Sequence, residues 1–466
     1  MSITMLLGII FAYYLCLHGI YLVLILIGAI QLRSYQSGIH FGDFQRIADS
    51  PLSLPFTVII PAYNEEKIII NTVLGALNLR YPLHEVILVN DGSSDRTLQT
   101  LIARFGLVRV NKFGQKRFAT QEVRGIYESQ AFPKLTVVDK VNGQRGDAIN
   151  AAANLARYPL LCIMDADCVF EEDALLRVVR PFLRNSRVVA AGGIVRPANG
   201  LMVEEGRITS YGLPRGALAL FQTVEYLRSF QWARLGLARL KSMLCISGAF
   251  LVVKKDIFIE MGGVNSRAIT DDIDFTVRLH RHIGERRAGE HLEIAYIPDP
   301  VCYTEVPETL RVFAAQRNRW QRGTLQALLG QPRMLFNPRY GMAGLFGMPF
   351  FLIFEALAAL VEGLSYLLIP FIFILGIATL DELILFFVLA ILLGTILSVS
   401  AVLLQESTRL RPARTRDLVK LLAAGFLENF GYHQMHLLWR IVGTFDYLIR
   451  RRTDLGLMQR YGSYQK

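Results

Sequence analysis

The chain has 466 residues, of which 52% are hydrophobic, and a formal net charge of +11 at pH 7. This length accommodates one large soluble domain together with membrane segments. Because the apolar residues form long runs with basic residues beside them, the positive charge indicates lipid-facing and cytoplasmic surfaces, and nucleic-acid binding is disfavoured.

The amino-terminal segment predicts a retained membrane anchor. The run from Ile3 to Ile30 has His18 as its one acidic or basic side chain and is long enough to span a bilayer. It lacks the basic start and the small-residue cleavage site of a secretory signal. We therefore assign residues 1–32 to an anchor and residues 33–54 to a linker.

Residues 55–325 show the alternation of an α/β domain. Two stretches repeat the order of strand, polar loop and helix: FTVIIPAYNEEKIIINTVLGAL and HEVILVNDGSSDRTLQTLIARF. A third strand, KLTVVDK, leads into VNGQRGDAIN, where Arg145 lies beside a helix that begins near Asp147, a favourable place for a phosphate. The pattern predicts a doubly wound sheet with its ligand loops on one edge. Between the second and third strands, residues 108–133 are predicted to be a ribbon or a long loop.

The stretch LLCIMDADC predicts a buried strand, Leu160 to Met164, that ends in two carboxylates. Asp165 and Asp167 are two positions apart, so in an extended chain they share a face. Two adjacent carboxylates repel, which favours a divalent cation between them and a ligand phosphate. The alternative is that the pair only ends the strand and caps the next helix.

The remainder of this domain is predicted to contain helices and two more strands, of which RVVAAGGIV is the first. We expect a helical region from Val203 to Leu244, followed by the strand CISGAFLVV. Asp271, Asp272 and Asp274 then head a helix, where carboxylates often serve only the helix dipole. We accept that interpretation for Asp274.

The stretch ETLRVFAAQRNRWQRG predicts a helix that carries Gln316, Arg319 and Trp320 on one face, because they stand at i, i+3 and i+4. An amphipathic basic helix lying on lipid would show the same spacing. The two interpretations are compatible.

Residues 326–449 predict membrane and interfacial helices, and residues 450–466 a basic cytoplasmic tail. The apolar run that starts at Gly344 carries Glu355 and Glu362, which must face protein or an aqueous path. A cleaner span follows the acidic pair at 381–382, and four arginines follow that span: Arg409, Arg411, Arg414 and Arg416. The positive-inside rule places this cluster in the cytoplasm. The same rule favours a re-entrant, hairpin or interfacial element for the last apolar stretch.

Six motifs in this order, PAYNEE, VNDGS, NGQRGDAIN, DAD, TDD and QRNRW, resemble the processive family 2 glycosyltransferases. That family includes cellulose, chitin, hyaluronan and poly-N-acetylglucosamine synthases. The resemblance covers nearly the whole chain, and it implies a GT-A nucleotide-diphospho-sugar transferase domain flanked by transmembrane and interfacial helices.

The resemblance also implies roles for individual residues. Asp272 matches the general base of the family and Asp167 the metal ligand of its DxD motif. The residues implied to bind the donor are Tyr63, Glu65, Asp91, Arg145, Asp147, Asp165 and Arg319. Those implied to bind the acceptor are Ser247, Gly248, Gln316 and Trp320. The chain departs from the family where Asp271 replaces a Glu and where Gln144-Arg145 replaces the usual Gly-Lys.

The implied reaction is inverting transfer of a hexose from a nucleotide-diphospho sugar, a UDP-sugar above all, with Mg2+ or Mn2+ as cofactor. Asp272 would accept the proton of the acceptor hydroxyl while the cation and Arg319 neutralise the leaving diphosphate. The implied partners are a growing glycan and the bilayer of the cell membrane, with the catalytic domain in the cytoplasm and no nucleic acid; an accessory subunit is left open. Two alternatives remain at this point: transfer of a single sugar to a polyprenyl-phosphate or other lipid, and a membrane transporter or scaffold with a nucleotide-binding domain.

Overall fold

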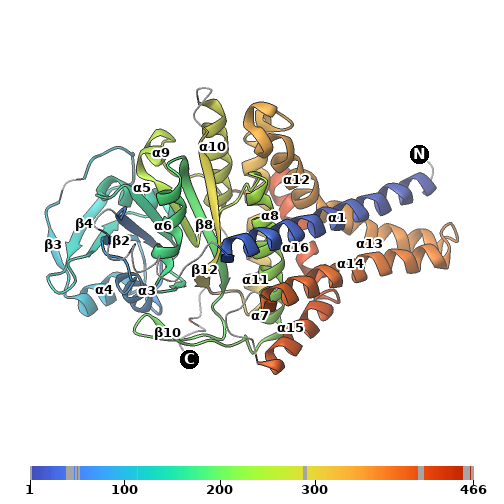
Figure 1. Ribbon diagram of the computed structural model, residues 1–466, viewed down its shortest axis with the longest axis horizontal. Helices are drawn as coiled ribbons and strands as arrows, with labels where there is room; N and C mark the ends of the chain where they lie inside the picture. The colour runs from blue at the N-terminus through green and yellow to red at the C-terminus, as the bar shows by residue number, and fades with distance from the viewer. Residues whose placement is uncertain are drawn as a thin grey trace. The chain divides into compact units, whose positions relative to one another are not determined.

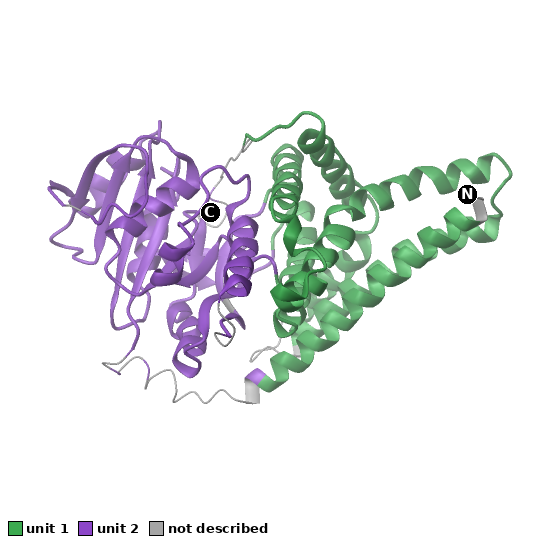
Figure 2. Cartoon of the chain, turned by 90° about the horizontal axis from the view of Figure 1, so that it is seen from above, with its two compact units in different colours: residues 1–34, 214–243, 307–458 green, residues 35–213, 244–306, 459–466 purple. Residues whose placement is uncertain are grey.

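The computed structural model describes residues 3–37, 47, 50, 53–112, 114–286, 291–407, 414–454 and 462. The chain divides into two compact units (Figure 2). Unit 1 contains Met1–Ser34, Pro214–Met243 and Pro307–Met458, and unit 2 contains Tyr35–Leu213, Leu244–Val306 and Gln459–Lys466. Residues 214–243 and 307–458 thus group with unit 1, although both segments begin inside the predicted domain 55–325. The predicted linker falls largely outside the described residues.

Within the described residues, unit 2 is built on a ten-stranded mixed sheet (Figure 1) with the order β3-β4-β5-β2-β1-β6-β11-β8-β12-β7. Its strands are β1 (Phe56–Ala62), β2 (His84–Asp91), β3 (Val108–Val110), β4 (Val123–Glu128), β5 (Leu135–Lys140), β6 (Leu160–Met164), β7 (Cys168–Phe170), β8 (Val188–Pro197), β11 (Phe250–Lys254) and β12 (Glu293–Thr304). Its helices are α3 (Ile69–Leu77), α4 (Thr97–Phe105), α5 (Gln144–Leu155), α6 (Ala174–Arg184), α9 (Lys255–Glu260) and α10 (Asp271–Glu285).

The order of the strands brings the functional loops to one edge of the sheet. β5, β2, β1 and β6 are parallel neighbours, so their carboxyl ends meet at the same edge. β11 runs antiparallel to β6 with Phe250 opposite Met164, and therefore the turn before β11 reaches this edge as well. The doubly wound prediction is confirmed for the parallel half of the sheet. The predicted ribbon at 108–133 is β3 and β4, which extend the sheet beyond β5 in antiparallel fashion.

Apolar burial explains why these segments form the sheet. Every residue of β1, β2 and β6 is buried, as expected for parallel strands covered on both faces. α5 packs on β1 and β2, and α6 packs on β8 and β12. α5 carries a run of three buried alanines at 151–153, whose small side chains allow close approach to the strands.

The prediction of a helix from Val203 is wrong for its first part. β9 (Met202–Glu204) and β10 (Arg207–Ser210) form a separate antiparallel hairpin. Glu205 and Gly206 between them have φ of 47° and 76°. Two consecutive residues of positive φ make the tight turn whose twist matches a hairpin, and Gly is favoured there.

Unit 1 is helical in its described residues. It contains α1 (Ile3–Ser37, of which the last residues fall in unit 2), α7 (Ala217–Glu225), η1 (Tyr226–Ala233), α8 (Arg234–Arg239), α11 (Leu310–Leu329), η2 (Pro332–Met334), η3 (Pro338–Tyr340), η4 (Ala343–Gly347), α12 (Met348–Phe350), η5 (Phe351–Ala356), α13 (Ala358–Ile374), α14 (Leu380–Ser407), α15 (Thr415–Leu427) and α16 (Tyr432–Leu448). The helix predicted for QRNRW is confirmed as α11.

Three segments of the described chain are long and apolar enough to cross a membrane: Met5–Tyr35, Ala343–Ile374 and Leu380–Glu406. They pack together through a buried cluster that includes Tyr14 of the first, Ile369 of the second and Phe386 of the third. The acidic pair at 381–382 lies in the first turn of α14, where Glu382 accepts from the backbone N–H of Thr379 (2.8 Å) as part of a capping box.

The two glutamates of the second span are bound to neighbouring helices. The Tyr21 hydroxyl of α1 donates to Glu355, and Glu362 lies 2.9 Å from Nε2 of His433 on α16. Both carboxylates therefore have protein partners, as polar groups at membrane depth require. These contacts favour a bracing role over a role in lining a passage.

The last apolar stretch is divided into two helices: α15 packs on α14 and α7, and α16 packs on α11 and α13. α15 and α16 are joined by residues 428–431, and Gly431 has φ of 93°, a value that glycine adopts without strain. Of the predicted basic cluster, Arg414 and Arg416 lie at the start of α15, whereas Arg409 and Arg411 lie outside the described residues. Most of the predicted basic tail also lies outside them.

Candidate active site

The loops after β1 and β2 are held together by Asn64. Its Oδ1 accepts from the backbone N–H of Ser94 (2.8 Å), and its own N–H donates to Ser93 Oγ (3.0 Å). Asn64 has φ of 58°, a conformation that Asn tolerates better than most residues. Beside it, Tyr63 is half exposed, and the N–H of Glu65 donates to Thr97 Oγ1 (2.9 Å). This junction presents the Tyr63 ring to solvent at the edge of the sheet.

A buried lysine sits between two carboxylates that we predicted to bind the donor. Nζ of Lys140 lies 2.7 Å from Asp91 and 3.4 Å from Asp147, and Lys140 has no exposed surface. Asp91 also accepts from the N–H of Gly143 (3.0 Å). Burial raises the pKa of Asp91, and the bonds from Lys140 and Gly143 oppose that rise. Asp91 and Asp147 thus hold the loop after β5 in place.

Lys140→Met is expected to destabilise the protein by about 3–5 kcal/mol, because two buried carboxylates lose their cation. The measurement is the denaturant midpoint of the purified chain. Lys112→Met is the matched control, since its partner Glu128 is 40% exposed and such a pair contributes only about 0–1 kcal/mol. Equal shifts in the two variants would contradict this account.

The guanidinium of Arg145 lies in the middle of the acidic groups at this edge. Its Nε donates to Asp165 Oδ1 (2.8 Å), its Nη2 donates to the carbonyl of Gly248 (2.8 Å), and its Nη1 contacts Asp271. Burial opposes the charged form of Arg145, but Asp165 and Asp271 outweigh it and raise the pKa above its ordinary value. Burial also raises the pKa of Asp271, and Arg145 opposes that shift. The Arg145 guanidinium is therefore charged and held in the first turn of α5, where it is a suitable partner for a diphosphate.

Asp272 faces the turn that precedes β11. Its Oδ2 accepts from the N–H of Gly248 (3.3 Å) and lies 3.7 Å from Sγ of Cys245. Ser247 belongs to the same turn, where its carbonyl accepts from the N–H of Phe250 (3.0 Å). The structure therefore brings Asp272, Ser247 and Gly248 together. Asp274, by contrast, pairs with Arg278 one turn along the same helix (2.8 Å), as the structural interpretation of this residue expects.

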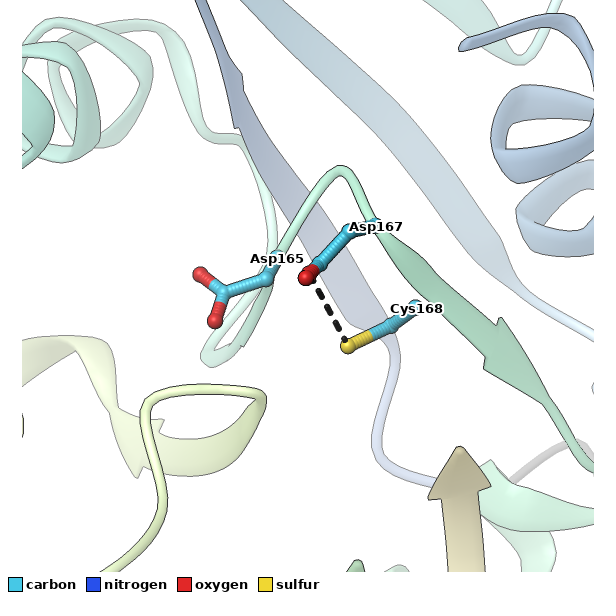
Figure 3. A group of neighbouring side chains, drawn as sticks. All are labelled: Asp165, Asp167 and Cys168. Atoms are coloured by element: carbon cyan, nitrogen blue, oxygen red, sulfur yellow. Dashed lines mark hydrogen bonds between the residues drawn. The ribbon is translucent and has the colours of Figure 1, made fainter. Parts of the chain in front are cut away.

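Asp165 and Asp167 flank the turn between β6 and β7 (Figure 3). Their carboxylate oxygens and Sγ of Cys168 lie within 4.8 Å of one another. Figure 3 shows that Asp167 points toward Cys168 and that Asp165 points away from it. Asp167 is buried and accepts from Thr304 Oγ1 (3.3 Å).

The chemistry of these groups fits a hard divalent cation held by oxygen. Mg2+ and Mn2+ prefer carboxylate oxygens to sulfur. Burial raises the pKa of Cys168 well above its ordinary value. By the preference for oxygen, Asp165 and Asp167 are the groups that suit the cation.

The three residues of the QRNRW motif with predicted roles lie in unit 1, on α11. Trp320 is partly exposed, and its ring meets that of Phe230 edge to face at a centroid distance of 6.1 Å. Gln316 and Arg319 are also partly exposed. The side chains of Gln316, Arg319 and Trp320 are thus accessible on this helix.

Sequence reasoning overlooked three residues of this region: Asn64, Lys140 and Cys245. Lys140 carried a usable signal, because a lysine at the end of a strand predicted to lie inside the sheet needs a buried anion. Cys245 carried none, since its nearness to Asp272 depends on how α10 meets the turn before β11. Gln144 was noted only as a replacement for glycine, and it adopts φ of 71°, which is strained for such a side chain.

Comparison with known families places these features in context. Residues 54–323 match the family described as Glycosyltransferase like family 2, and residues 286–424 match the family described as Chitin synthase. The chain is 27% identical over 272 residues to Poly-beta-1,6-N-acetyl-D-glucosamine synthase of Staphylococcus epidermidis, covering 58% of this chain and 55% of that protein. The protein of the same name from Staphylococcus aureus (strain COL) is 27% identical over 274 residues, covering 59% and 55%. The chain thus matches little more than half the length of these relatives.

Among solved structures, the mannosyltransferase PcManGT from Pyrobaculum calidifontis in complex with GDP-Man and Mn2+ is similar in fold. The alignment covers 94% of this chain and 100% of that one, with a TM-score of 0.50 and 17% sequence identity. At this identity the likeness shows the fold alone. It confirms the predicted GT-A class with apolar helices flanking the sheet.

Proposed function

This chain belongs to the family 2 glycosyltransferases, and we propose that it elongates a β-linked polysaccharide from a nucleotide-diphospho sugar, a UDP-sugar above all, at the cytoplasmic face of the cell membrane. The observation that carries the proposal is the arrangement of Asp165, Asp271 and Asp272 around the cation of Arg145. It provides a proton acceptor and a diphosphate partner at the edge where α/β sheets bind ligands. The relatives that are polysaccharide synthases and the three candidate spans support elongation and export.

The chemistry follows from these groups. A sugar hydroxyl is a poor nucleophile, so Asp272 accepts its proton as the new C–O bond forms at the anomeric carbon. The bond to the nucleoside diphosphate breaks in the same displacement, and Arg145 neutralises the charge on this leaving group. Because the displacement is single and in line, the anomeric configuration inverts, and an α-linked donor gives a β-linked product.

A divalent cation, Mg2+ or Mn2+, fits the carboxylates of Asp165 and Asp167 and would supply further charge neutralisation at the diphosphate. The solved mannosyltransferase of similar fold holds Mn2+ together with its nucleotide sugar, which supports this assignment. Tyr63, Glu65, Asp91 and Asp147 line or hold the loops where the nucleoside would bind.

We assign acceptor binding to Gln316 and Trp320, which lie on α11 within unit 1. A partly exposed Trp ring offers a stacking surface for a sugar, and Gln316 lies one helical turn before Trp320. This surface is most useful when the end of a polymer must be held between additions. That consideration favours processive elongation over transfer of a single sugar to a lipid.

Detergent-purified full chain given a panel of radiolabelled sugar nucleotides tests the proposal. Incorporation into material of high molecular mass is expected with one donor. Formation of a single lipid adduct would contradict elongation and would support transfer of one sugar to a lipid acceptor. No incorporation with any donor would favour a transporter or scaffold.

Trp320→Ala is expected to shorten the product and to raise the KM for the acceptor by about tenfold, because the stacking surface is lost. Product length is measured by gel filtration of labelled glycan. Trp320→Phe keeps an aromatic face and should retain most of the length. Products of unchanged length in Trp320→Ala would exclude this ring from the acceptor site.

A further inference from the structure

Arg317, the second residue of QRNRW, has a buried charge that the proposed mechanism does not use. It is 1% exposed. Its Nη1 and Nη2 donate to the two carboxylate oxygens of Glu225 at 2.7 and 3.0 Å, a bidentate pair. The Tyr432 hydroxyl also donates to Glu225. Glu225 is the last residue of α7, so this one carboxylate joins α7, α11 and α16 within unit 1.

The same guanidinium lies over the ring of Trp320. The distance from Cζ of Arg317 to the centroid of the Trp320 ring is 4.5 Å, which is within the range of a cation–π contact. The two residues are three positions apart on α11 and therefore share a face. The guanidinium also lies 4.8 Å from the ring of Phe313, one turn earlier. The buried Arg317 guanidinium thus packs against the ring of Trp320, which is itself partly exposed.

A second contact to Trp320 comes from the segment that follows Glu225. η1 is a π-helix, a form that is uncommon and often found at functional sites. It carries Phe230, whose ring meets the Trp320 ring edge to face. Phe230 is fixed in turn by stacking on Tyr226 (4.4 Å) and by Arg234, whose Cζ lies 4.1 Å from its centroid. The Trp320 ring therefore contacts both Arg317, which Glu225 binds, and Phe230 of the segment that follows Glu225.

General stability does not explain why a charge pair occupies this position. A buried ion pair contributes little more than an apolar pair of similar volume, because both ions lose their hydration. Burial opposes the charged form of Arg317, and Glu225 more than compensates, so the pKa of Arg317 is raised. What an apolar pair could not supply is a planar cation with a fixed orientation against the indole.

We propose that Arg317 and Glu225 are positioning residues for Trp320: their bidentate pair sets the guanidinium plane that fixes the indole for the acceptor sugar. The inference rests on the proposed function for its acceptor, and on the contacts above for the positioning. Arg317→Lys keeps the charge but loses the bidentate pair and the planar stack. Glu225→Gln keeps a hydrogen-bond acceptor but removes the anion.

The test combines kinetics with a direct probe of the ring. The chain has three Trp residues, so the full-length protein labelled with 5-fluorotryptophan should give three 19F resonances, and Trp320→Phe assigns one of them. Arg317→Lys and Glu225→Gln should each shift the Trp320 resonance and raise the acceptor KM about tenfold, with the donor KM close to that of the wild type. Arg322→Lys is the matched control: Arg322 is also 1% exposed and lies on α11, but bonds to Asn318 and to the carbonyls of Arg452 and Asp454.

An unmoved Trp320 resonance in both variants would overturn the proposal, and so would equal changes in Arg317→Lys and Arg322→Lys. If Arg317→Lys does not fold, Glu225→Gln decides by the same two readouts. A purified protein that transfers no sugar would instead refute the proposed function, and the 19F resonances would still decide whether the pair positions the ring.

Discussion

Asp272→Asn is expected to lower kcat by roughly 10²–10⁴-fold while the affinity for the donor stays close to that of the wild type. The substitution removes the proton acceptor but preserves the shape of the side chain and its ability to accept from the N–H of Gly248. Initial rates of sugar transfer measure the first quantity, and equilibrium binding of the nucleotide diphosphate measures the second.

The matched control for this experiment is Asp274→Asn. Asp274 stands on the same helix, but pairs with Arg278 and serves no step of the reaction. Its replacement should leave kcat nearly unchanged. If Asp272→Asn retained turnover but lost donor affinity, the residue would be a donor ligand and another group would be the base.

Asp167→Ala is expected to weaken donor binding in the presence of Mg2+ or Mn2+ by at least roughly 10–100-fold, and to abolish the dependence of binding on the cation. The reason is that the carboxylate of Asp167, near that of Asp165, is the oxygen ligand that suits a hard cation at this turn. Titration of nucleotide binding with and without Mn2+ gives both quantities.

Cys168→Ser is the control for the neighbouring thiol. Sγ of Cys168 lies 3.7 Å from Oδ1 of Asp167, but sulfur is a poorer ligand than oxygen for a hard cation. Serine keeps the hydrogen bond, so the cation dependence should persist. An unchanged requirement for the cation in Asp167→Ala, or its loss in Cys168→Ser alone, would contradict the assignment of the ligand.

The edge of the sheet could be predicted from sequence because its signals are local. The strands before Asp91, Asp165 and the NGQRG loop are short apolar runs, and each is followed by polar or glycine residues that end a strand. Both features are visible in the sequence itself. The parallel order of β5, β2, β1 and β6 then brings their ends together without further information. The roles of the individual side chains remain predictions.

Long-range pairing could not be predicted. The Arg145 contacts with Asp271 and Gly248 join segments more than a hundred residues apart, and no spacing rule encodes them. For the same reason the sequence left open whether Glu362 would line a passage, and the structure gives it His433 as a partner. The missed hairpin at β9 and β10 is different, because its Glu-Gly turn was a local signal that the apolar pattern around it obscured.

We propose that this enzyme adds many sugars to one acceptor before releasing it. The most direct measurement is the length distribution of product formed early in the reaction, with the acceptor in large excess over the enzyme. Processive elongation predicts a few long chains beside unextended acceptor. A population in which nearly every acceptor gains one or two sugars would contradict it.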